Sequence, residues 1–491
     1  MQAQPAPLDD ARRRRALRLV VWEGVLSMGA GDVLLLGWVL TYFCQEMGAR
    51  DVSLAVVLAV PSFMGLLRLA APLVISRTGN RKWVCILSHS LAIAVALVMP
   101  ALALGLVRPP AELRLSVLIA VLCAMFLFRY IGSVAWLSWM GDLVPSTHWG
   151  RYFGLRAAWW NAVAMLTGLA VGAGLDAWTQ AFPDRKLAGY GCVLLIGITA
   201  KLASLVPLLF VPNLPLGRSP ATPPGWREIL VPLRDPEFRR LARFGCWLAL
   251  GQGFPQAAFG QAAFRFLQLP QLAMQSNRIV ARVFNVLGNR TAGRLSDRFG
   301  NRPVLSLALL FASTGPFFWL PASPGVWTAW FSVFIAHAVW GAGWAGVVLS
   351  EQNLLLKLSP RGNNAAYLAA YEALTGLTSA ASILLGGLLL RRLTTIDFHL
   401  SLGPAALNAY QIFFLLSFVG QASALFWLRS VTEPRSRTVS HLFRALARVP
   451  GLRPRRLASR AVAGVAILLR GSTARAAADP LTSGPPSTPS T

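Results

Sequence analysis

Long apolar segments separated by short polar loops run through almost the whole chain of 491 residues. A helix needs about 20 apolar residues to cross a lipid bilayer. Measured against that length, the pattern predicts about twelve membrane-spanning helices, which we number span 1 to span 12. Their predicted ranges are 18–45, 52–76, 83–106, 115–141, 152–177, 188–212, 241–266, 270–296, 303–322, 326–350, 364–390 and 406–430.

Both halves of the chain carry a charged, glycine-containing loop at the same place in the order of spans. The loop between spans 8 and 9 runs from Gly293 to Arg302 and reads Gly-Arg-Leu-Ser-Asp-Arg-Phe-Gly-Asn-Arg. A partial copy between spans 2 and 3 runs from Ser76 to Arg81 and reads Ser-Arg-Thr-Gly-Asn-Arg. The repetition indicates a membrane protein made of two duplicated halves.

The loop that begins at Gly293 resembles the signature loop of the major facilitator superfamily, which links helices 2 and 3 of that family and is echoed between helices 8 and 9. The resemblance implies an all-α integral membrane protein with twelve transmembrane helices in two pseudo-symmetric six-helix bundles, the major facilitator fold. It also implies that spans 3, 6, 9 and 12 are outer supports. The stretch from Leu143 to Arg156 is similar to that of poorly characterised bacterial permeases.

Composition divides the chain further. Residues between the two halves are rich in proline and charge, which is typical of a linker, and the C-terminal segment is rich in arginine and then in serine and proline, which predicts a largely disordered tail. The predicted parts are a cytoplasmic N-terminal arm (1–17), a first six-helix bundle (18–212), a cytoplasmic linker (213–240), a second six-helix bundle (241–430) and a basic cytoplasmic tail (431–491).

Charge is scarce in the chain and lies mainly at the ends of the apolar segments. Charged residues make up 13% of the chain, whereas soluble proteins carry roughly a quarter. The net charge of +27 comes mainly from arginine in one set of loops and in the tail, so it indicates topology rather than nucleic-acid binding. Because positive charge stays on the cytoplasmic side, we expect both termini inside and the chain in the bacterial inner (plasma) membrane.

Signatures of catalysis and metal binding are absent from the sequence. It has no Gly-x-Ser-x-Gly, no His-Glu-x-x-His and no paired Cys-x-x-Cys, and the five cysteines are scattered through the predicted spans. We therefore expect no enzyme, no metal and no cofactor.

One match to Gly-x-Gly-x-x-Gly runs from Gly341 to Gly346, but no strand precedes it. Small residues at this spacing in an apolar helix predict close helix packing instead of a dinucleotide site.

The repeated loops are predicted to close the cytoplasmic mouth of the protein. By the resemblance, Asp297 lies opposite the first turn of span 5, where its carboxylate would meet free N–H groups and the positive end of the helix dipole. The alternative is that the charges of these loops only set topology. The predicted gate consists of Gly293, Asp297, Arg298, Gly300, Arg302, Glu351, Arg77, Arg81 and Asp142.

Two ion pairs are expected within this gate. Arg298 or Arg302 would pair with Glu351 at the end of span 10. In the first half, Arg77 or Arg81 would pair with Asp142 at the end of span 4.

Ionisable residues inside the spans are candidates for proton coupling, since charge within a membrane is costly and is mostly functional. Asp32 is the first candidate, because a buried carboxylate near an arginine can alternate between a paired and a protonated state. Arg129 opens a sequence, Arg-Tyr-Ile-Gly, that resembles a span-4 pattern of proton-coupled members of the superfamily. A buried structural pair is the alternative. The full set is Asp32, Arg129, Glu23, His337 and Glu372.

Span 8 carries a polar stripe that we expect to face a central cavity. Its members are spaced 4, 3 and 4 residues apart, which places them on one helical face. Nearby aromatic residues complete the predicted lining, which is Arg278, Arg282, Asn285, Asn289, Trp340, Trp344 and Tyr371. The excess of arginine predicts an anionic or carboxyl-bearing substrate held by Arg129 and Arg282. The alternative is that Asp32 already neutralises Arg129.

Together these observations predict a secondary active transporter that moves a small organic solute by alternating access and is coupled to protons. The expected partners are the solute, protons and the lipid bilayer, with no nucleic acid, and the expected state is a monomer. Two other functions stay open. One is an efflux pump for amphipathic compounds, and the other is a non-transporting membrane sensor or assembly factor with the same fold.

Overall fold

The computed structural model describes residues 9–144, 149–213, 231–324, 327–358, 364–402, 405–433, 436 and 441–442. By its internal contacts the chain forms one unit, Met1–Pro434, and a second, Arg435–Thr491. The first unit holds all the predicted spans and is described here. The predicted linker 213–240 lies outside the described residues from 214 to 230.

The first half of the chain is helical at each of its six predicted spans. Span 1 comprises α1 (Asp10–Gly24), the π-helical η1 (Val25–Gly31), α2 (Asp32–Leu35) and α3 (Trp38–Glu46). Span 2 comprises α4 (Asp51–Met64), the 3₁₀-helical η2 (Gly65–Ala70) and α5 (Ala71–Thr78). The others are α6 (Arg81–Ala96) with α7 (Val98–Ala103), η3 (Ala111–Leu113) with α8 (Arg114–Leu143), α9 (Trp149–Ala181), and η5 (Pro183–Arg185) with α10 (Lys186–Phe210).

The second half repeats this arrangement. Its first span comprises α12 (Pro236–Gly253), α13 (Gln256–Gln261) and the π-helical η7 (Ala262–Phe266), preceded by η6 (Val231–Arg234). The others are α14 (Gln271–Phe299), α15 (Asn301–Ser313) with η8 (Gly315–Trp319), α16 (Trp327–Leu358), α17 (Asn364–Thr395) and α18 (Ala409–Leu428).

One short β-hairpin, not expected from the sequence, lies between α17 and α18. Strand β1 (Leu400–Leu402) pairs antiparallel with β2 (Ala405–Leu407). Span 12, predicted to start near residue 406, starts as a helix at Ala409, because Ala406 belongs to β2. The helix begins after Asn408, whose side chain accepts the Gln411 N–H at 3.0 Å while the Gln411 side chain accepts the Asn408 N–H at 3.0 Å. This reciprocal capping fixes where α18 starts.

Nine helical segments in the described part of the chain are long and apolar enough to cross a membrane. They coincide with predicted spans 1 to 6 and 10 to 12. The segments at spans 7, 8 and 9 are helical too, but each is shorter, interrupted or more polar than the other nine. Helix α14, for example, carries Arg278 and Arg282. These three segments are placed by packing instead, with α14 and α15 against α16, and α12 against α17 and α18.

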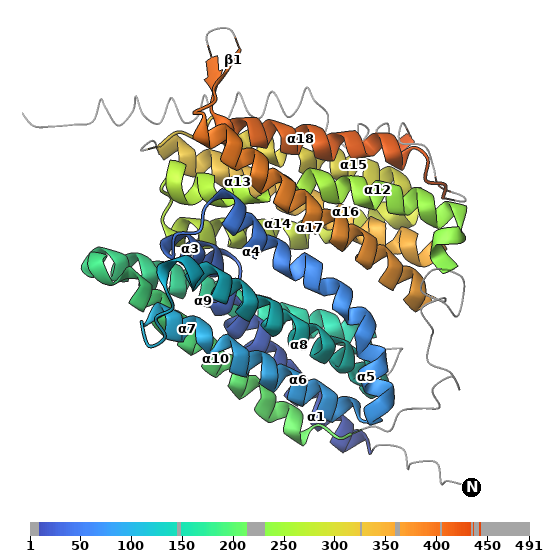
Figure 1. Ribbon diagram of the computed structural model, residues 1–491. Helices are drawn as coiled ribbons and strands as arrows, with labels where there is room; N and C mark the ends of the chain where they lie inside the picture. Colours follow the sequence, from blue (N-terminus) through green and yellow to red (C-terminus); the bar gives the residue numbers. More distant parts are fainter. Residues whose placement is uncertain are drawn as a thin grey trace, which may run out of the picture. The chain divides into compact units, whose positions relative to one another are not determined.

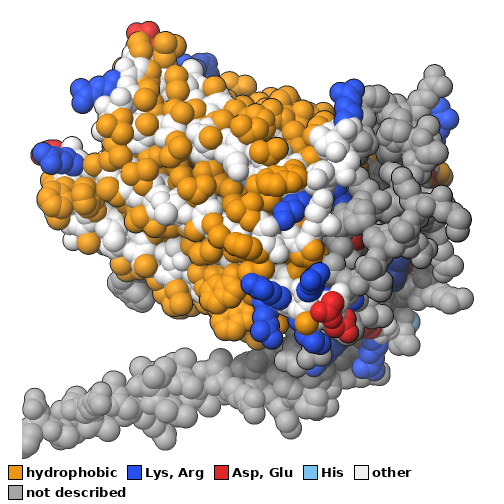
Figure 2. All heavy atoms as spheres, turned by 90° about the horizontal axis from the view of Figure 1, so that it is seen from below, with side chains coloured by type: hydrophobic (Ala, Val, Ile, Leu, Met, Phe, Trp, Pro, Cys, Tyr) orange, Lys and Arg blue, Asp and Glu red, His pale blue; other side chains and the backbone are white. Residues whose placement is uncertain are grey.

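The outside of the helices is apolar, as in an integral membrane protein. Leu91 of α6 and Ile196 and Leu202 of α10 are among the exposed large hydrophobic side chains. Figure 2 shows hydrophobic side chains covering most of this face, with lysine and arginine gathered toward its borders. Such a surface is stable against lipid tails and unstable in water.

The two halves form two bundles (Figure 1). One apolar core cluster lies wholly in the second half, whereas the largest cluster joins the first half to residues of the second, such as Met274 and Val333. The bundles contact one another along α4 with α17 and along α9 with α14. Small residues allow the second contact, since a Cβ on Gly172 would lie 2.8 Å from the Cα of Leu272. We call the end of the bundles that holds Asp10 and Leu428 the proximal end, and the opposite end the distal end.

The Gly-x-Gly-x-x-Gly stretch lies at a crossing of helices. A Cβ on Gly341 of α16 would lie 2.2 Å from the carbonyl oxygen of Ala281 of α14, and a Cβ on Gly343 would lie 2.6 Å from the backbone N of Ala312 of α15. These glycines therefore let three helices approach to backbone contact. The predicted role in helix packing agrees with this geometry.

Candidate functional site

A cavity of about 620 Å³ lies between the two bundles, in the proximal half of the helices. Its walls come from α4 and η2, α8, α12, α16 and α17, so both halves of the chain contribute. The polar and aromatic side chains that line it are Ser62, Arg68, Tyr130, Gln252, Trp344, Glu351, Gln352, Tyr371, Glu372, Thr375 and Ser379. A mostly apolar cavity of this size with a few polar groups is typical of small-molecule sites.

One ion pair crosses the cavity from bundle to bundle. The Arg68 guanidinium of η2 lies 2.9 Å from the Glu372 carboxylate of α17. The same guanidinium lies over the ring of Tyr130, 4.3 Å from its centroid. The hydroxyl of Tyr130 in turn donates to the carbonyl of Pro61 at 2.9 Å. Both charges of this pair are thus engaged within the protein.

A second carboxylate in the cavity has a different environment. Glu351 of α16 accepts a short hydrogen bond from the hydroxyl of Tyr371, and it makes no ion pair among the described residues. In the same cavity, Nε2 of Gln252 is buried and has no hydrogen-bond partner there. The wall near Glu351 therefore offers a negative group and an unused polar group to a bound molecule.

The bundles are tied together at the distal end. The Asp176 carboxylate, near the end of α9, accepts the N–H groups of Gln271 and Leu272, each at 2.8 Å. The Tyr42 hydroxyl donates to the carbonyl of Leu269 at 2.9 Å, and Gln261 donates to Asp51 at 3.0 Å. The cavity is therefore closed off distally by polar contacts between the bundles.

The first bundle contains a buried charge network of its own. Arg129 of α8 donates two hydrogen bonds to the Asp32 carboxylate, at 2.6 and 2.7 Å. Lys201 of α10 lies 2.5 Å from the same carboxylate and donates to the Ser27 hydroxyl at 3.0 Å. Asp32 directly follows the π-helical η1, and π-helical turns are frequent at functional sites. One carboxylate is therefore held by two cations.

A second buried pair lies nearer the proximal end of span 1. Arg156 of α9 donates to Glu23 at 2.8 Å and to the carbonyl of Val20 at 3.2 Å. Its guanidinium lies 4.4 Å from the centroid of the Trp136 ring. Arg156 thus has an ionic, a backbone and an aromatic partner, and is held rigidly.

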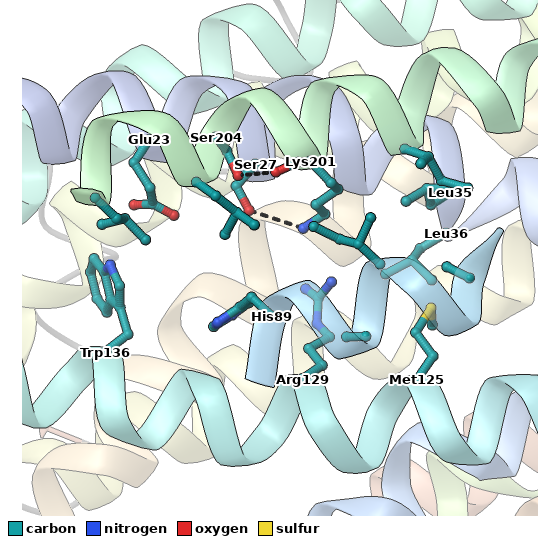
Figure 3. Close-up of a pocket in the computed structure, with 16 residues that line it drawn as sticks. Glu23, Ser27, Leu35, Leu36, His89, Met125, Arg129, Trp136, Lys201 and Ser204 are labelled. Carbon is teal, nitrogen blue, oxygen red and sulfur yellow. Dashed lines mark hydrogen bonds between the residues drawn. The ribbon is translucent and has the colours of Figure 1, made fainter. Parts of the chain in front are cut away.

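A small pocket of about 40 Å³ separates the two buried pairs. Figure 3 shows Arg129 and Lys201 pointing toward one another across it, with Trp136 and His89 closing the other side. Nε1 of Trp136 is buried and has no partner among the described residues, whereas Nδ1 of His89 lies 2.8 Å from the carbonyl of Cys85. Because about 10–15 Å³ suffices for one water, the pocket has room for water but not for a solute. It shares no lining residue with the large cavity.

The structure places Asp32 and Arg129 in the buried network, Glu23 in the second buried pair with Arg156, and Glu372 in the large cavity. His337 lies elsewhere: its Nδ1 is 2.8 Å from the carbonyl of Val333 and its ring contacts Trp319. It lines neither the cavity nor the pocket. His337 is thus the member of the predicted proton-coupling set that the structure separates from both.

The polar stripe of span 8 does not line the large cavity, contrary to the prediction. Asn285 donates to the backbone carbonyl of Gly341 at 3.2 Å, and Asn289 donates to Asn285 at 3.0 Å. Arg282 lies 5.8 Å from the centroid of the Trp160 ring. Asn285 thus meets α16, whereas Arg282 meets α9 of the first bundle.

The two predicted arginine anchors, Arg129 and Arg282, have different neighbours, Asp32 and Trp160. Arg129 is already neutralised by Asp32, which is the alternative that the sequence left open. Arg278 packs against the break in span 1, where a Cβ on Gly37 would lie 2.4 Å from its Nη1. Of the predicted aromatic lining, Trp344 and Tyr371 face the cavity, whereas Trp340 stacks on Trp344 from outside it.

The predicted gate is only partly assembled. Arg81 lies 2.6 Å from Asp142, as one of the expected pairs, while Arg77 is exposed. Asp297 is exposed and makes no hydrogen bond or ion pair among the described residues. Gly300 forms the turn between α14 and α15 with φ of 97°. Gly293 lies in α14, with only the Leu349 side chain near it.

The expected pairing of Glu351 with Arg298 or Arg302 is not formed. Arg302 donates to the carbonyl of Arg429 at 2.9 Å, and Arg298 lies over the ring of Phe299. Glu351 contacts Tyr371 instead. The physical reason is the direction of the side chains, because Glu351 faces the cavity and Tyr371 while Arg302 reaches the carbonyl of Arg429, although α14 and α15 both pack against α16.

Several residues at these sites were not predicted to act there. Asp176 is the clearest case, because an acid at the end of one span facing the start of another is the same signal that singled out Asp297. Lys201 was visible as a charge within span 6, but nothing in the sequence gave its partner. Glu433 was assigned to the tail, yet it accepts the N–H groups of Asn301 and Arg302 at 3.1 and 2.8 Å.

Among the described residues, no group of three or more His, Cys, Asp or Glu is placed to hold a metal.

No family model matches the sequence, and no curated protein matches it, but solved structures match most of the chain. A bacterial homologue of the iron transporter ferroportin, in an inward-facing state, is 15% identical, with 85% of this chain and 98% of that chain covered and a TM-score of 0.62. The xylose transporter XylE from E. coli, in an inward-open conformation, is 17% identical over 88% and 99%, with a TM-score of 0.59. The nucleoside transporter NupG is 14% identical over 86% and 98%, with a TM-score of 0.58.

At these identities the likeness shows the fold. The chain has the major facilitator fold that the loop beginning at Gly293 predicts, and it is an integral membrane protein. The similar structures are transporters rather than enzymes.

Proposed function

We propose that the protein is a secondary active transporter that carries a small organic solute across the membrane by alternating access. The observation that carries this proposal is the cavity of about 620 Å³ between the bundles. It is closed distally where Asp176 holds the start of α14, and it lies on the proximal side, where Asp297 is exposed. A central cavity closed at one end is what rocking of two bundles about a substrate site requires.

The proximal end is proposed to be the cytoplasmic end. The loops at this end carry Arg77, Arg81, Arg298, Arg302 and Lys357, and positive charge is retained inside. Accordingly both termini and the linker are cytoplasmic, and the cavity faces inward. Labelling of single cysteines in intact cells tests this. The loops 45–51 and 178–187 should react with an impermeant reagent from outside, and reaction from the cytoplasmic side only would reverse the proposed topology.

Proton coupling is proposed to act through the network of Asp32, Arg129 and Lys201. A proton arriving on Asp32 would remove the charge that holds both cations. Arg129 and Tyr130 are neighbours on α8, and Tyr130 lines the large cavity beneath Arg68. We propose that a change in the Arg129 pair reaches the cavity wall through this adjacent residue. This placement separates the proton site from the substrate site while keeping them on one helix.

Transport in proteoliposomes tests the function directly. Purified full-length protein is reconstituted, and a broad panel of labelled metabolites is assayed for uptake and efflux with a pH gradient imposed in either direction. We expect at least one solute to move, and its movement to depend on the gradient. A folded, correctly inserted protein that moves no member of the panel in either direction would support the non-transporting alternative.

A further inference from the structure

The ionisable groups of the large cavity are unequal in sign. Its lining contains two carboxylates, Glu351 and Glu372, and one guanidinium, Arg68. Arg68 and Glu372 neutralise one another at 2.9 Å. The group left over is Glu351, whose one hydrogen-bond partner among the described residues is the Tyr371 hydroxyl. The unbalanced charge that faces a bound solute is therefore negative.

The surroundings of Glu351 suit a cation with an apolar body. Trp344 lies two turns earlier on α16 and lines the same cavity. Its ring stacks on Trp340 with centroids 5.7 Å apart and an interplanar angle of 7°, which fixes its orientation. Aromatic faces attract cations as well as apolar groups. The buried Nε2 of Gln252, which also lines the cavity, is a donor, so it would serve an acceptor atom of the solute and not its ammonium group.

Resting on the proposed transport function, we propose that the substrates are small organic cations, and that Glu351 binds their protonated amine while Trp344 contacts their apolar part. Tyr371 orients the Glu351 carboxylate through its hydroxyl. This replaces the anionic substrate expected from the arginines of the spans.

The arginines do not offer a competing anion site in this cavity. Arg129 and Arg282 are not among its lining residues. The third arginine, Arg68, has its guanidinium committed to Glu372 and to the Tyr130 ring. A solute carboxylate would have to displace Glu372 and would then lie near two unneutralised glutamates. An ammonium group meets no such repulsion.

Two matched ligand series test the sign of the preferred charge on the wild-type protein. The first is tryptamine, tryptophol and indole-3-acetate, and the second is benzylamine, benzyl alcohol and benzoate. Within each series the ring is constant while the charge passes from positive through neutral to negative. Binding to the purified full-length protein is measured by ligand-dependent thermal stabilisation. The amines should bind at least about tenfold more tightly than the carboxylates.

Substitution of Glu351 tests the residue. Glu351→Gln keeps the size of the side chain and its contact with Tyr371 while removing the charge. Amine affinity should fall by at least about tenfold, while the neutral alcohols should be affected little. The matched control is Glu112→Gln, since Glu112 is exposed in η3 at the distal end, away from the cavity.

The outcomes separate this inference from the transport function. Tighter binding of the carboxylates, binding of no amine in either series, or equal amine affinity in wild type and Glu351→Gln would overturn the cation preference. The metabolite panel in proteoliposomes then decides the transport function on its own. A transporter that moves only anions or neutral solutes would retain the function and lose this inference. If Glu351→Gln does not fold, the two series on the wild type still decide the sign of the charge.

Discussion

The carboxylate of Asp176, near the distal end of α9, accepts the backbone N–H of Gln271, the first residue of α14, at 2.8 Å. The following N–H, of Leu272, binds the other carboxylate oxygen at the same distance. The sequence predicts the reverse arrangement at the proximal end, where Asp297 near the end of α14 would face the start of α9. These two helices thus carry acids that can each cap the other, one at each mouth.

Asp176→Asn should weaken closure of the distal mouth. Loss of the charge at the N-terminus of α14 removes roughly 0.3–2 kcal/mol, which shifts a two-state equilibrium several-fold. Spin labels at Thr179 and Gln268 report the opening as a larger population at long distance. Asp184→Asn, an exposed acid in the neighbouring η5, is the control. An unchanged distance distribution in the Asp176 variant would show that this cap does not hold the mouth.

Asp297→Asn should shift the same equilibrium in the opposite direction. Asp297 is exposed in the present arrangement, so its substitution leaves the proximally open state unchanged and weakens only the closed one. Crosslinking between the loop around residue 297 and the start of α9 should therefore decrease. Crosslinking equal to that of the wild type would exclude the predicted latch.

Asp32→Asn should be more damaging than Lys201→Met. Removing Asp32 leaves two buried cations without their carboxylate, and breaking a buried pair in this way costs about 3–5 kcal/mol. Removing Lys201 leaves Asp32 in its two-bond pair with Arg129. Thermal unfolding of the purified variants should show the larger loss of stability for Asp32→Asn, and proton-driven transport should be lost with it. Equal stabilities would mean that Asp32 is not the centre of this network.

Glu433 should stabilise the second bundle in a pH-dependent way. Burial alone would raise the pKa of Glu433, but the Arg302 N–H, the Lys357 ammonium and the Asn301 N–H and side chain outweigh it, so the pKa lies below its ordinary value of 4.5. A carboxyl whose pKa is lowered by folding stabilises the fold above its unfolded pKa and loses that contribution as pH falls through the folded pKa.

Glu433→Gln should therefore lower the unfolding temperature at neutral pH, by the equivalent of about 1–3 kcal/mol. The difference from the wild type should persist as the pH falls to 4.5 and shrink only below it. Melting curves at a series of pH values measure this. A difference that vanished well above that pH would contradict the lowered pKa.

Gly341→Ala should destabilise the packing of α14 against α16. The added Cβ would lie 2.2 Å from the carbonyl oxygen of Ala281, and overpacking of this kind costs about 1–3 kcal/mol. Gly174→Ala is the matched control, because a Cβ there meets nothing within 4 Å and alanine is the better helix former. Opposite signs of the two stability changes are expected, and equal changes would argue against a close crossing at Gly341.

The fold was accessible from the sequence because membrane helices are specified by local composition. Apolar length places the spans, and the repeated loop at Gly293 gives the duplication, without knowledge of any long-range contact. The β-hairpin before α18 was not predicted, and two of its six paired residues, Ala406 and Leu407, were placed in the neighbouring span because they are apolar. Its limits are set by a capping interaction at Asn408.

The candidate site was less accessible because it depends on helix rotation. The spacing of Arg282 and Asn285 predicts one face of α14, but it does not say which neighbours that face meets. In the structure Asn285 meets α16 at Gly341, and Arg282 meets Trp160 of α9. The pairing of Asp32 with Lys201 joins residues far apart in the chain, and a single sequence holds no record of such a contact.

The irregular turns of the first bundle determine where it can bend. Arg68, which ties this bundle to α17, projects from the 3₁₀-helical η2, and Asp32 follows the π-helical η1. Backbone hydrogen bonds in such turns are less regular than in an α-helix and mark hinges. Force applied through the Arg68–Glu372 pair therefore acts on the most compliant part of span 2. At Arg68 the same short segment therefore forms part of the cavity wall and the point where span 2 can bend.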